Sequence, residues 1–180
     1  MKPTPDIVQG AIDAMLALAA ERAWREISLR QIAEKADVPF ADLFALANGK
    51  DALLHRLSVR FDAAALATAA TASDDPHDRL FDAVMARVEA MEPNRTALMS
   101  IYHGLAAARV APSLPRTARA MLEAAGIDAT PPRLLAMTAI WIRIVQVWRD
   151  DEGALNRTMA EIDLRLKQMR TRLGRIGAGF

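Results

Sequence analysis

The stretch from Ile27 to Leu54 constrains the fold of this chain more than any other part of the sequence. Ser28 followed by Gln31 has the spacing of a capping box, which predicts that a short helix begins there. The apolar positions of that helix recur at i, i+3, i+4 and i+7, and they are Leu29, Ile32, Ala33 and Ala36. Val38 suits a tight turn, and Pro39 suits the start of a second short helix. The stretch therefore predicts two short helices joined by a tight turn.

The remainder of the sequence predicts an all-α chain. Apolar residues make up 52% of it and aromatic residues only 5%, and Ala, Leu and Met supply most of the apolar positions. Such a composition favours helices, because β-branched and aromatic residues are the ones that favour strands. Helix starts at Asp75-Pro76 and Thr130-Pro131 and a helix end at Gly126 are marked by cap residues. We expect about nine helices, with a three-helix head over residues 1–47 and a helical body over residues 48–180.

Several classes of protein are disfavoured by what the sequence lacks. Cysteine is absent, so neither disulfides nor thiolate chemistry is possible. No apolar run has transmembrane length and no signal-peptide core is visible, so we expect a cytoplasmic protein. The three histidines are scattered and no catalytic or phosphate-binding motif is present. We therefore expect no enzyme activity, no metal site and no cofactor.

The pattern from Ile27 to Leu54 resembles the helix-turn-helix of TetR-type transcriptional regulators. The likeness rests on the capping residue Ser28, on an apolar residue at Leu43 and on Lys50, which follows a break at Asn48-Gly49. In that family the second short helix enters the major groove of DNA. The resemblance implies a repressor that binds DNA as a homodimer and responds to a small apolar ligand. The residues that it places at the DNA are Ser28, Arg30, Phe40, Asp42, Phe44 and Lys50.

The second short helix departs from the family pattern at its outward positions. The family commonly has Lys, Thr, Tyr and Arg-His where this chain has Phe40, Asp42, Phe44 and Ala45-Leu46. Reading bases requires donors and acceptors at the groove edge. Residues 1–50 also carry six Lys and Arg against seven Asp and Glu, whereas a head that binds a polyanion is normally basic.

A second hypothesis therefore stays open, in which the helix-turn-helix no longer binds DNA and the body binds a lipid or isoprenoid. The TetR-like lipid-binding family of ubiquinone biosynthesis is the precedent. The segment from Trp148 to Arg165 resembles the C-terminal part of that family and equally resembles TetR-type regulators. It does not separate the two hypotheses.

The TetR resemblance also implies an effector pocket among the helices of the body. Methionine side chains are flexible and polarizable, so they suit either a pocket for a bulky apolar ligand or an irregular core. Tyr102 and His103 form the most concentrated polar pair of the region. The candidate ligand-binding residues are Met85, Met99, Tyr102, His103, Met121, Met137 and Trp141.

The last two helices are the candidate dimer interface. The helix from Leu134 to Trp148 is apolar almost all round, so more than one neighbour must cover it. The last helix has apolar residues at alternating steps of four and three, namely Leu155, Met159, Ile162, Leu166, Met169, Leu173 and Ile176. This seam can pack in the chain's own core or across a two-fold axis. The resemblance favours the dimer, with Arg143, Trp148, Met159, Leu166 and Met169 as its contacts.

Two charged features leave alternatives open. Arg143 interrupts the apolar helix and must be paired or reach water, so it either pairs with an acid at the dimer edge or anchors an anionic ligand. Residues 164–180 carry five basic residues and no acid. This basic end is explained by a solvated helix C-terminus or by contact with a membrane surface.

Overall fold

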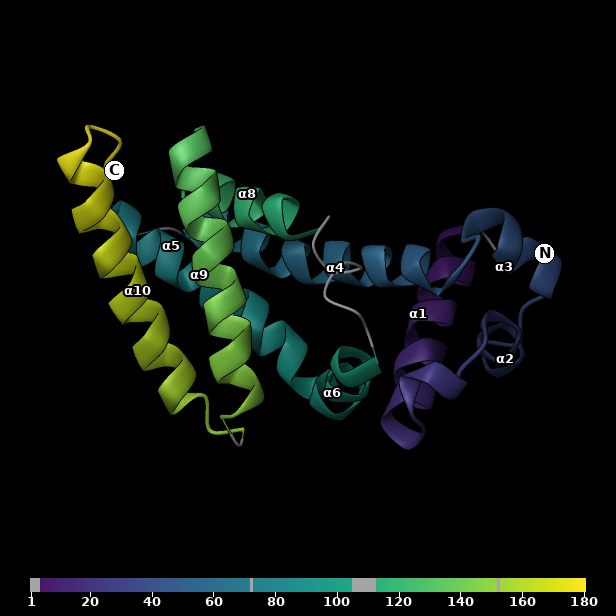
Figure 1. Cartoon of the computed structure of the whole chain (residues 1–180). Coiled ribbons are helices and arrows are strands. Elements are labelled where there is room, and N and C mark those ends of the chain that lie inside the picture. The colour runs from purple at the N-terminus through teal and green to yellow at the C-terminus, as the bar shows by residue number, and fades with distance from the viewer. Residues whose placement is uncertain (1–3, 72, 105–112, 152) are drawn as a thin grey trace. The chain divides into compact units, whose positions relative to one another are not determined.

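The structure is a computed structural model that describes residues 4–71, 73–104, 113–151 and 153–180. Over these residues the chain forms α-helices and short 3-10 helices and no strand, so the predicted all-α class is confirmed (Figure 1). Contacts between Cα atoms divide the chain into a head unit (Met1–Val59 and Pro93–Val110) and a body unit (Arg60–Glu92 and Ala111–Phe180). The sequence instead placed residues 48–180 in one body. The difference arises because α6 (Arg95–Gly104) packs on the first helix of the chain.

The head unit is built around α1 (Thr4–Glu21), which packs against α2 (Leu29–Lys35), α3 (Phe40–Leu46) and α6. The apolar stripe of α1 is buried as its spacing predicts, and its members are Ile7, Ala11, Met15 and Leu18. Between α1 and α2 lies a 3-10 helix, η1 (Trp24–Glu26). The helix α4 (Lys50–Ala67) follows α3 and continues into the body unit.

Trp24 of η1 lies against the end of α6. Its side chain is buried, and α6 ends against it at Gly104. A Cβ atom added to Gly104 would lie 2.8 Å from the Cβ of Trp24, which is shorter than any ordinary carbon–carbon contact. Glycine at this position therefore lets α6 approach the Trp24 side chain.

The body unit consists of the end of α4, η2 (Thr68–Thr71), α5 (Pro76–Met91), the first residue of η3 (Glu92–Asn94), α8 (Leu114–Ala124), α9 (Pro131–Arg149) and α10 (Asn156–Arg175). Helix α9 lies between α8 and α10, and α5 packs against both α8 and α10. Two predicted caps are confirmed. The Asp75 carboxylate accepts the N–H of His77 at the start of α5. After α8, Gly126 has φ +67° and Ile127 donates to the Leu122 carbonyl, the Schellman pattern.

The apolar seam of α10 faces mainly into the body unit. Ile162, Leu166, Met169 and Leu173 are buried, and the neighbours of α10 in the same unit are α9 and α5. The seam emerges only near its ends, where Met159 is 42% and Ile176 67% exposed. The central seam of α10 therefore belongs to the core of its own chain.

A network of charged side chains is buried inside the body unit. Asp62 of α4 accepts hydrogen bonds from Arg87 Nε (2.9 Å), Arg116 Nη2 (2.8 Å) and Thr117 Oγ1 (3.0 Å). The guanidinium of Arg87 also lies 4.5 Å from the ring centroid of Trp141. Asp62, Arg87 and Thr117 are each no more than 5% exposed. Buried charge of this kind persists only where hydrogen bonds and an opposite charge compensate it.

The start of α10 is fixed by Asp151. Its Oδ2 accepts hydrogen bonds from both the backbone N–H and the hydroxyl of Thr158, each at 2.7 Å. Leu155, which immediately precedes α10, is left-handed (φ 55°) and supplies no side-chain cap. Burial raises the pKa of the Asp151 carboxyl, but the hydrogen bonds from Thr158 outweigh it and hold the pKa below its ordinary value of 3.8. Asp151 therefore caps the N-terminus of α10, although it precedes the helix by several residues in the sequence.

This capping predicts a loss of stability in acid. Because the folded-state pKa of Asp151 is lowered, its contribution is present above about pH 4 and is lost as the pH falls through the folded-state value. Urea unfolding of the whole chain between about pH 7 and pH 3 measures the effect. Asp151→Asn should lower stability at neutral pH and flatten the acid dependence, and Asp150→Asn, at an exposed neighbour, should change neither. An unchanged acid dependence in Asp151→Asn would contradict the assignment.

Candidate functional site

Helix α2, the turn that follows it and α3 form a helix-turn-helix. Ser28 Oγ accepts the N–H of Gln31 (3.2 Å), and Gln31 Oε1 accepts the N–H of Ser28 (2.8 Å), so the predicted capping box is confirmed. Asp37 has φ 53°, a left-handed conformation that Asp tolerates better than most residues. Val38 then donates to the Ala33 carbonyl and is buried. These local bonds fix the direction in which α3 leaves α2.

Three predicted DNA-contact residues form one aromatic cluster on this surface. The rings of Phe40 and Phe44 lie 5.9 Å apart, and the Arg30 guanidinium lies 4.8 Å from the centroid of Phe40. Phe44 is 52% exposed, and Phe40 is half-buried. Asp42 is exposed on the same short helix. The outward side of α3 therefore presents aromatic carbon and one carboxylate.

The charge of this surface is also unlike that of a typical DNA-binding face. The exposed charged residues of α2, the turn and α3 are Arg30, Lys35, Glu34, Asp37 and Asp42, a net charge of −1. Helix α3 itself contains no lysine, arginine, serine, threonine, asparagine or glutamine. Phosphate affinity and base reading both depend on such groups. Of the residues that the resemblance places at the DNA, Ser28 and Arg30 are the exposed hydrogen-bond donors on this surface.

Lys50 is oriented toward the head unit itself. Its Nζ donates to the carbonyl oxygens of Trp24 (2.9 Å) and Ile27 (2.5 Å), and it lies 4.2 Å from the ring centroid of Trp24. An ammonium has three donors, and two of them are used in these bonds. Lys50 therefore fastens the start of α4 to the segment between α1 and α2.

We expect Lys50→Met to destabilise the head unit by about 2 kcal/mol, because charge-assisted hydrogen bonds and a cation–π contact are lost together. Urea unfolding of the full chain measures the change. Lys35→Met is the control, since Lys35 is an exposed lysine at the end of α2. If Lys50→Met kept wild-type stability, the bonds from Lys50 to the Trp24 and Ile27 carbonyls would be unimportant for folding, and a phosphate role would be favoured.

The predicted ligand-binding residues fall into two separate sets. Met85, Met121, Met137 and Trp141 are buried in the core of the body unit. The other three, Met99, Tyr102 and His103, lie on α6 in the head unit, where His103 is exposed. The sequence could not separate these sets because the methionine pattern does not reveal which unit α6 joins. The four body residues pack as core side chains, the alternative that the sequence left open.

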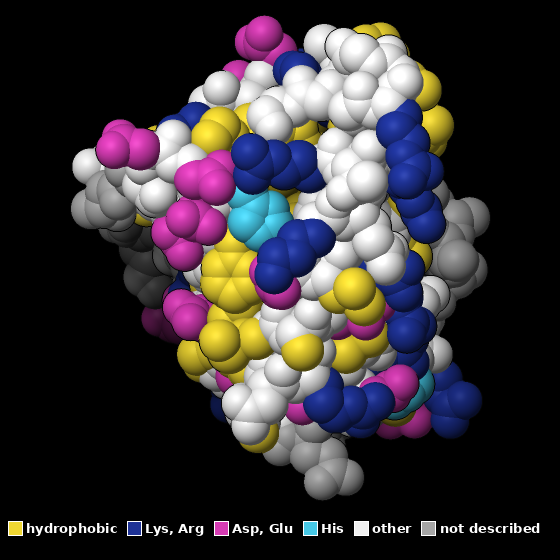
Figure 2. All heavy atoms as spheres, turned by 90° about the vertical axis from the view of Figure 1, so that its left-hand side faces the viewer, with side chains coloured by type: hydrophobic (Ala, Val, Ile, Leu, Met, Phe, Trp, Pro, Cys, Tyr) yellow, Lys and Arg dark blue, Asp and Glu magenta, His cyan; other side chains and the backbone are white. Residues whose placement is uncertain are grey.

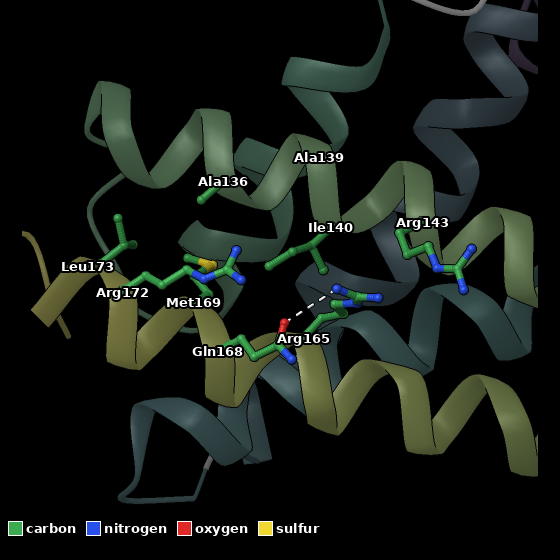
Figure 3. Close-up of a pocket in the computed structure, with 9 residues that line it drawn as sticks. All are labelled: Ala136, Ala139, Ile140, Arg143, Arg165, Gln168, Met169, Arg172 and Leu173. Atoms are coloured by element: carbon green, nitrogen blue, oxygen red, sulfur yellow. Dashed lines mark hydrogen bonds between the residues drawn. The ribbon is translucent and has the colours of Figure 1, made fainter.

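A pocket of about 350 Å³ lies between α9 and α10 of the body unit (Figure 3). We name it the α9–α10 groove, and its lining residues are Ala136, Ala139, Ile140, Arg143, Arg165, Gln168, Met169, Arg172 and Leu173. Sequence reasoning placed Arg143 and Met169 in a dimer interface and did not single out Arg165, Gln168 or Arg172 as site residues. The run of basic residues in 164–180 was the available signal.

Glu161 organises the basic side of this groove. Its Oε1 accepts hydrogen bonds from Arg165 Nε (2.7 Å) and Arg143 Nε (2.9 Å). The hydrogen bond from Arg165 is the main reason that the pKa of Glu161 lies below its ordinary value; burial opposes it, and Arg143 lowers it further. Arg143 is thus paired with an acid of its own chain. Arg165 also donates from Nη1 to Gln168 Oε1 (3.3 Å), as drawn in Figure 3.

The predicted dimer contacts divide between the interior and the surface. Trp148 is buried and donates from Nε1 to Glu92 Oε2 (2.6 Å), and Leu166 and Met169 are buried as well. Side chains so enclosed in one chain offer little surface to a second copy. Arg143 and Met159 are exposed. Other exposed apolar side chains of α9 and α10 are Leu135, Ile142 and Leu164.

The surface carries uneven charge. Figure 2 shows a face on which Lys and Arg side chains line one edge and also lie in the middle beside exposed hydrophobic side chains, while most acidic side chains lie toward the opposite edge. Among the described residues, no group of His, Cys, Asp and Glu side chains could hold a metal ion. No helix in the described part of the chain is long and apolar enough to cross a membrane.

Comparison with solved structures identifies the architecture. A TetR transcriptional regulator from Rhodococcus sp. RHA1 matches with a TM-score of 0.74 and 17% identity over 94% of this chain and 98% of that one. The fatty acid degradation regulator FadR from Bacillus halodurans matches with a TM-score of 0.53 and 15% identity over 94% and 96%. A TetR-like transcriptional regulator from Rhodococcus sp. RHA1 matches with a TM-score of 0.50 and 22% identity over 94% and 95%. No family model and no curated protein matches the sequence. The chain therefore has the fold of TetR-type transcriptional regulators.

Proposed function

We propose that this chain is a TetR-type transcriptional regulator, a repressor that binds DNA as a homodimer and responds to an apolar ligand. The observation that carries the proposal is the complete helix-turn-helix, with its capping box at Ser28 and its left-handed turn at Asp37. The structural neighbours support it, because they are described as transcriptional regulators. A fold hosts many functions, so the DNA-binding role needs its own test.

The residues proposed to meet DNA have unequal roles. Arg30 is exposed and would contact phosphate, as would the Ser28 hydroxyl, whose hydrogen is not used in the capping box. The rings of Phe40 and Phe44 would contact thymine methyl groups. Asp42 would accept from a cytosine amino group and would be repelled by phosphates. Lys50 would act mainly by holding the start of α4 to the segment that precedes α2.

We propose that the dimer forms through the outward faces of α9 and α10. Leu135, Ile142 and Leu164 expose 74%, 40% and 47% of their surface there. A two-fold axis would place this surface against its own copy and cover all three side chains. Light scattering coupled to size exclusion tests the dimer, and a monomer at micromolar concentration would contradict it.

A DNA titration tests the regulator directly. Fluorescence anisotropy compares the chain's own upstream duplex with a random duplex over a salt series. A regulator should bind its own duplex selectively, with an affinity that falls steeply as salt rises. Arg30→Ala should weaken binding about five- to tenfold, and Arg119→Ala, an exposed arginine of α8, should leave it unchanged. Absence of binding to any duplex at low salt would contradict the proposal.

A second candidate function is lipid or isoprenoid binding without DNA binding. It is favoured by the position of Lys50, whose ammonium is held by main-chain carbonyls, and by the aromatic outward side of α3. The basic end of α10 would then meet a membrane surface, where Arg172 and Arg175 are exposed. Native mass spectrometry of protein purified from its host would reveal a co-purified lipid. Co-sedimentation with anionic vesicles tests the membrane contact.

A further inference from the structure

The outward side of α3 presents three kinds of side chain in a fixed order. Successive residues of a helix are turned by about 100°, so this order follows from the sequence of α3. Phe44 lies at one margin and Asp42 at the other. The two positions between them are Ala41 and Ala45, and all four side chains are exposed. Leu43, on the opposite side of the helix, is fully buried. The exposed surface therefore runs from an aromatic ring through methyl groups to a carboxylate.

A methyl group and a carboxylate are neighbours on this surface. Ala45 follows Asp42 by three positions, a spacing at which side chains lie about 5–6 Å apart on a helix. The Asp42 carboxylate makes no hydrogen bond or ion pair with the residues that the structure describes. Both side chains are short, so the edge of a base brought against α3 can touch both at once.

The bases of DNA differ in what they offer to such a pair. In the major groove guanine presents two acceptors, adenine an acceptor beside a donor, and thymine an acceptor beside a methyl group. A carboxylate only accepts hydrogen bonds, so each of these acceptors is unfavourable next to Asp42. Cytosine presents its N4 amino group, a donor, and no acceptor. Cytosine is therefore the base whose edge suits Asp42.

The methyl group of Ala45 adds a second requirement. In unmodified cytosine the carbon beside the amino-bearing position, C5, carries only hydrogen. A methyl group on C5 would lie next to the amino group and would give Ala45 an apolar partner. Thymine carries the same methyl group, but it has the acceptor O4 where cytosine has the amino group. The pair thus fits a base edge that combines a donor with a methyl group.

We propose that α3 recognises a cytosine that is methylated at C5, with its amino group donating to Asp42 and its methyl group packed on Ala45. The inference rests on the proposed DNA binding and names the base that the second short helix reads. A homodimer carries two copies of α3, so a two-fold symmetric DNA site presents two methylated cytosines. The chain is then a regulator whose hold on DNA increases when the DNA is methylated.

Two random duplex libraries test the proposal, one made with cytosine and the other with 5-methylcytosine. Each library carries its own barcode, and their mixture is selected on the full chain, each being made again with its own cytosine between rounds. The best selected sequence is then prepared in both forms and titrated by fluorescence anisotropy. Burying one methyl group contributes a factor of about four in affinity, so two half-sites should favour the methylated form about tenfold or more.

Variants of α3 locate the contact. Asp42→Asn adds a donor and should shift the selected base from methylated cytosine to adenine, because an amide pairs with adenine. Glu34→Gln removes the same charge from an exposed position of α2 and should keep the selected base. Ala45→Ser places a hydroxyl at the methyl contact and should lower the preference for methylated DNA to below about threefold. Ala63→Ser, at an exposed position of α4, should leave that preference unchanged.

The outcomes separate this inference from the proposed function. Equal affinity for the two forms, or a preference for unmethylated cytosine, would overturn the inference while DNA binding itself stood. Equal effects of Asp42→Asn and Glu34→Gln on the selected base would also overturn it, since the contact would then lie outside α3. Absence of binding to any duplex in either form at low salt would contradict the proposed regulator and this inference together. Circular dichroism checks that each variant keeps its helical content.

Discussion

Replacing Asp62 with alanine should lower the free energy of unfolding of the body unit by about 3–5 kcal/mol. The carboxylate compensates two arginines, since Arg87 and Arg116 donate to its two oxygens. The Arg87 side chain is 6% exposed, so without Asp62 its charge would stay buried with its main counter-ion removed. Urea unfolding followed by circular dichroism measures the loss.

Two further variants separate the buried charge from other effects. Glu89→Ala removes an exposed carboxylate of α5 and should change stability by no more than about 0.5 kcal/mol. The double variant Asp62→Leu with Arg87→Met replaces both charges by apolar groups and should recover part of the loss. A loss below about 1 kcal/mol in Asp62→Ala would mean that the pair is not compensated as the distances indicate.

Leu166→Ala should be almost as damaging, with a loss of about 2–5 kcal/mol. Leu166 lies on the inward face of α10 and is fully buried, so removing its branched end leaves a cavity in the core of the chain. Because the cavity lies inside one chain, the loss should not depend on protein concentration. Thermal unfolding at several concentrations measures both properties.

Leu164 supplies the matched control on the same helix. It is 47% exposed, and Leu164→Ala should change the stability of the chain by less than about 1 kcal/mol while weakening the proposed dimer. The opposite outcome would contradict the inward placement of the seam. In that case Leu166→Ala would change self-association and Leu164→Ala would change folding.

Features fixed by neighbouring residues were predictable from the sequence. The capping box of α2, the start of α5 at Asp75 and the glycine that ends α8 each depend on side chains within a few positions of one another. Their chemistry is local, so residue types at fixed spacing predict them. These local signals predict where helices begin and end, and the succession of helices predicts the all-α class.

Features fixed by distant residues were not predictable. Asp62 meets Arg87 and Thr117 across 25 and 55 positions, and no periodicity pairs them. Lys50 has the identity expected of a phosphate contact, yet its partners are carbonyls 26 and 23 positions earlier. The seam of α10 shows only that one face is apolar, and an apolar face does not name its neighbour. Sequence patterns therefore gave the elements and left their pairing open.

The three tryptophans provide a built-in optical readout for each unit. Trp24 lies in the head unit, and Trp141 and Trp148 lie in the body unit. All three are buried, so their emission should shift to longer wavelength when the surrounding side chains separate. Replacing Trp24 with Phe leaves only body emission, and replacing the other two leaves only head emission. Paired melting curves from these variants would show whether the two units lose their structure in one transition or in two.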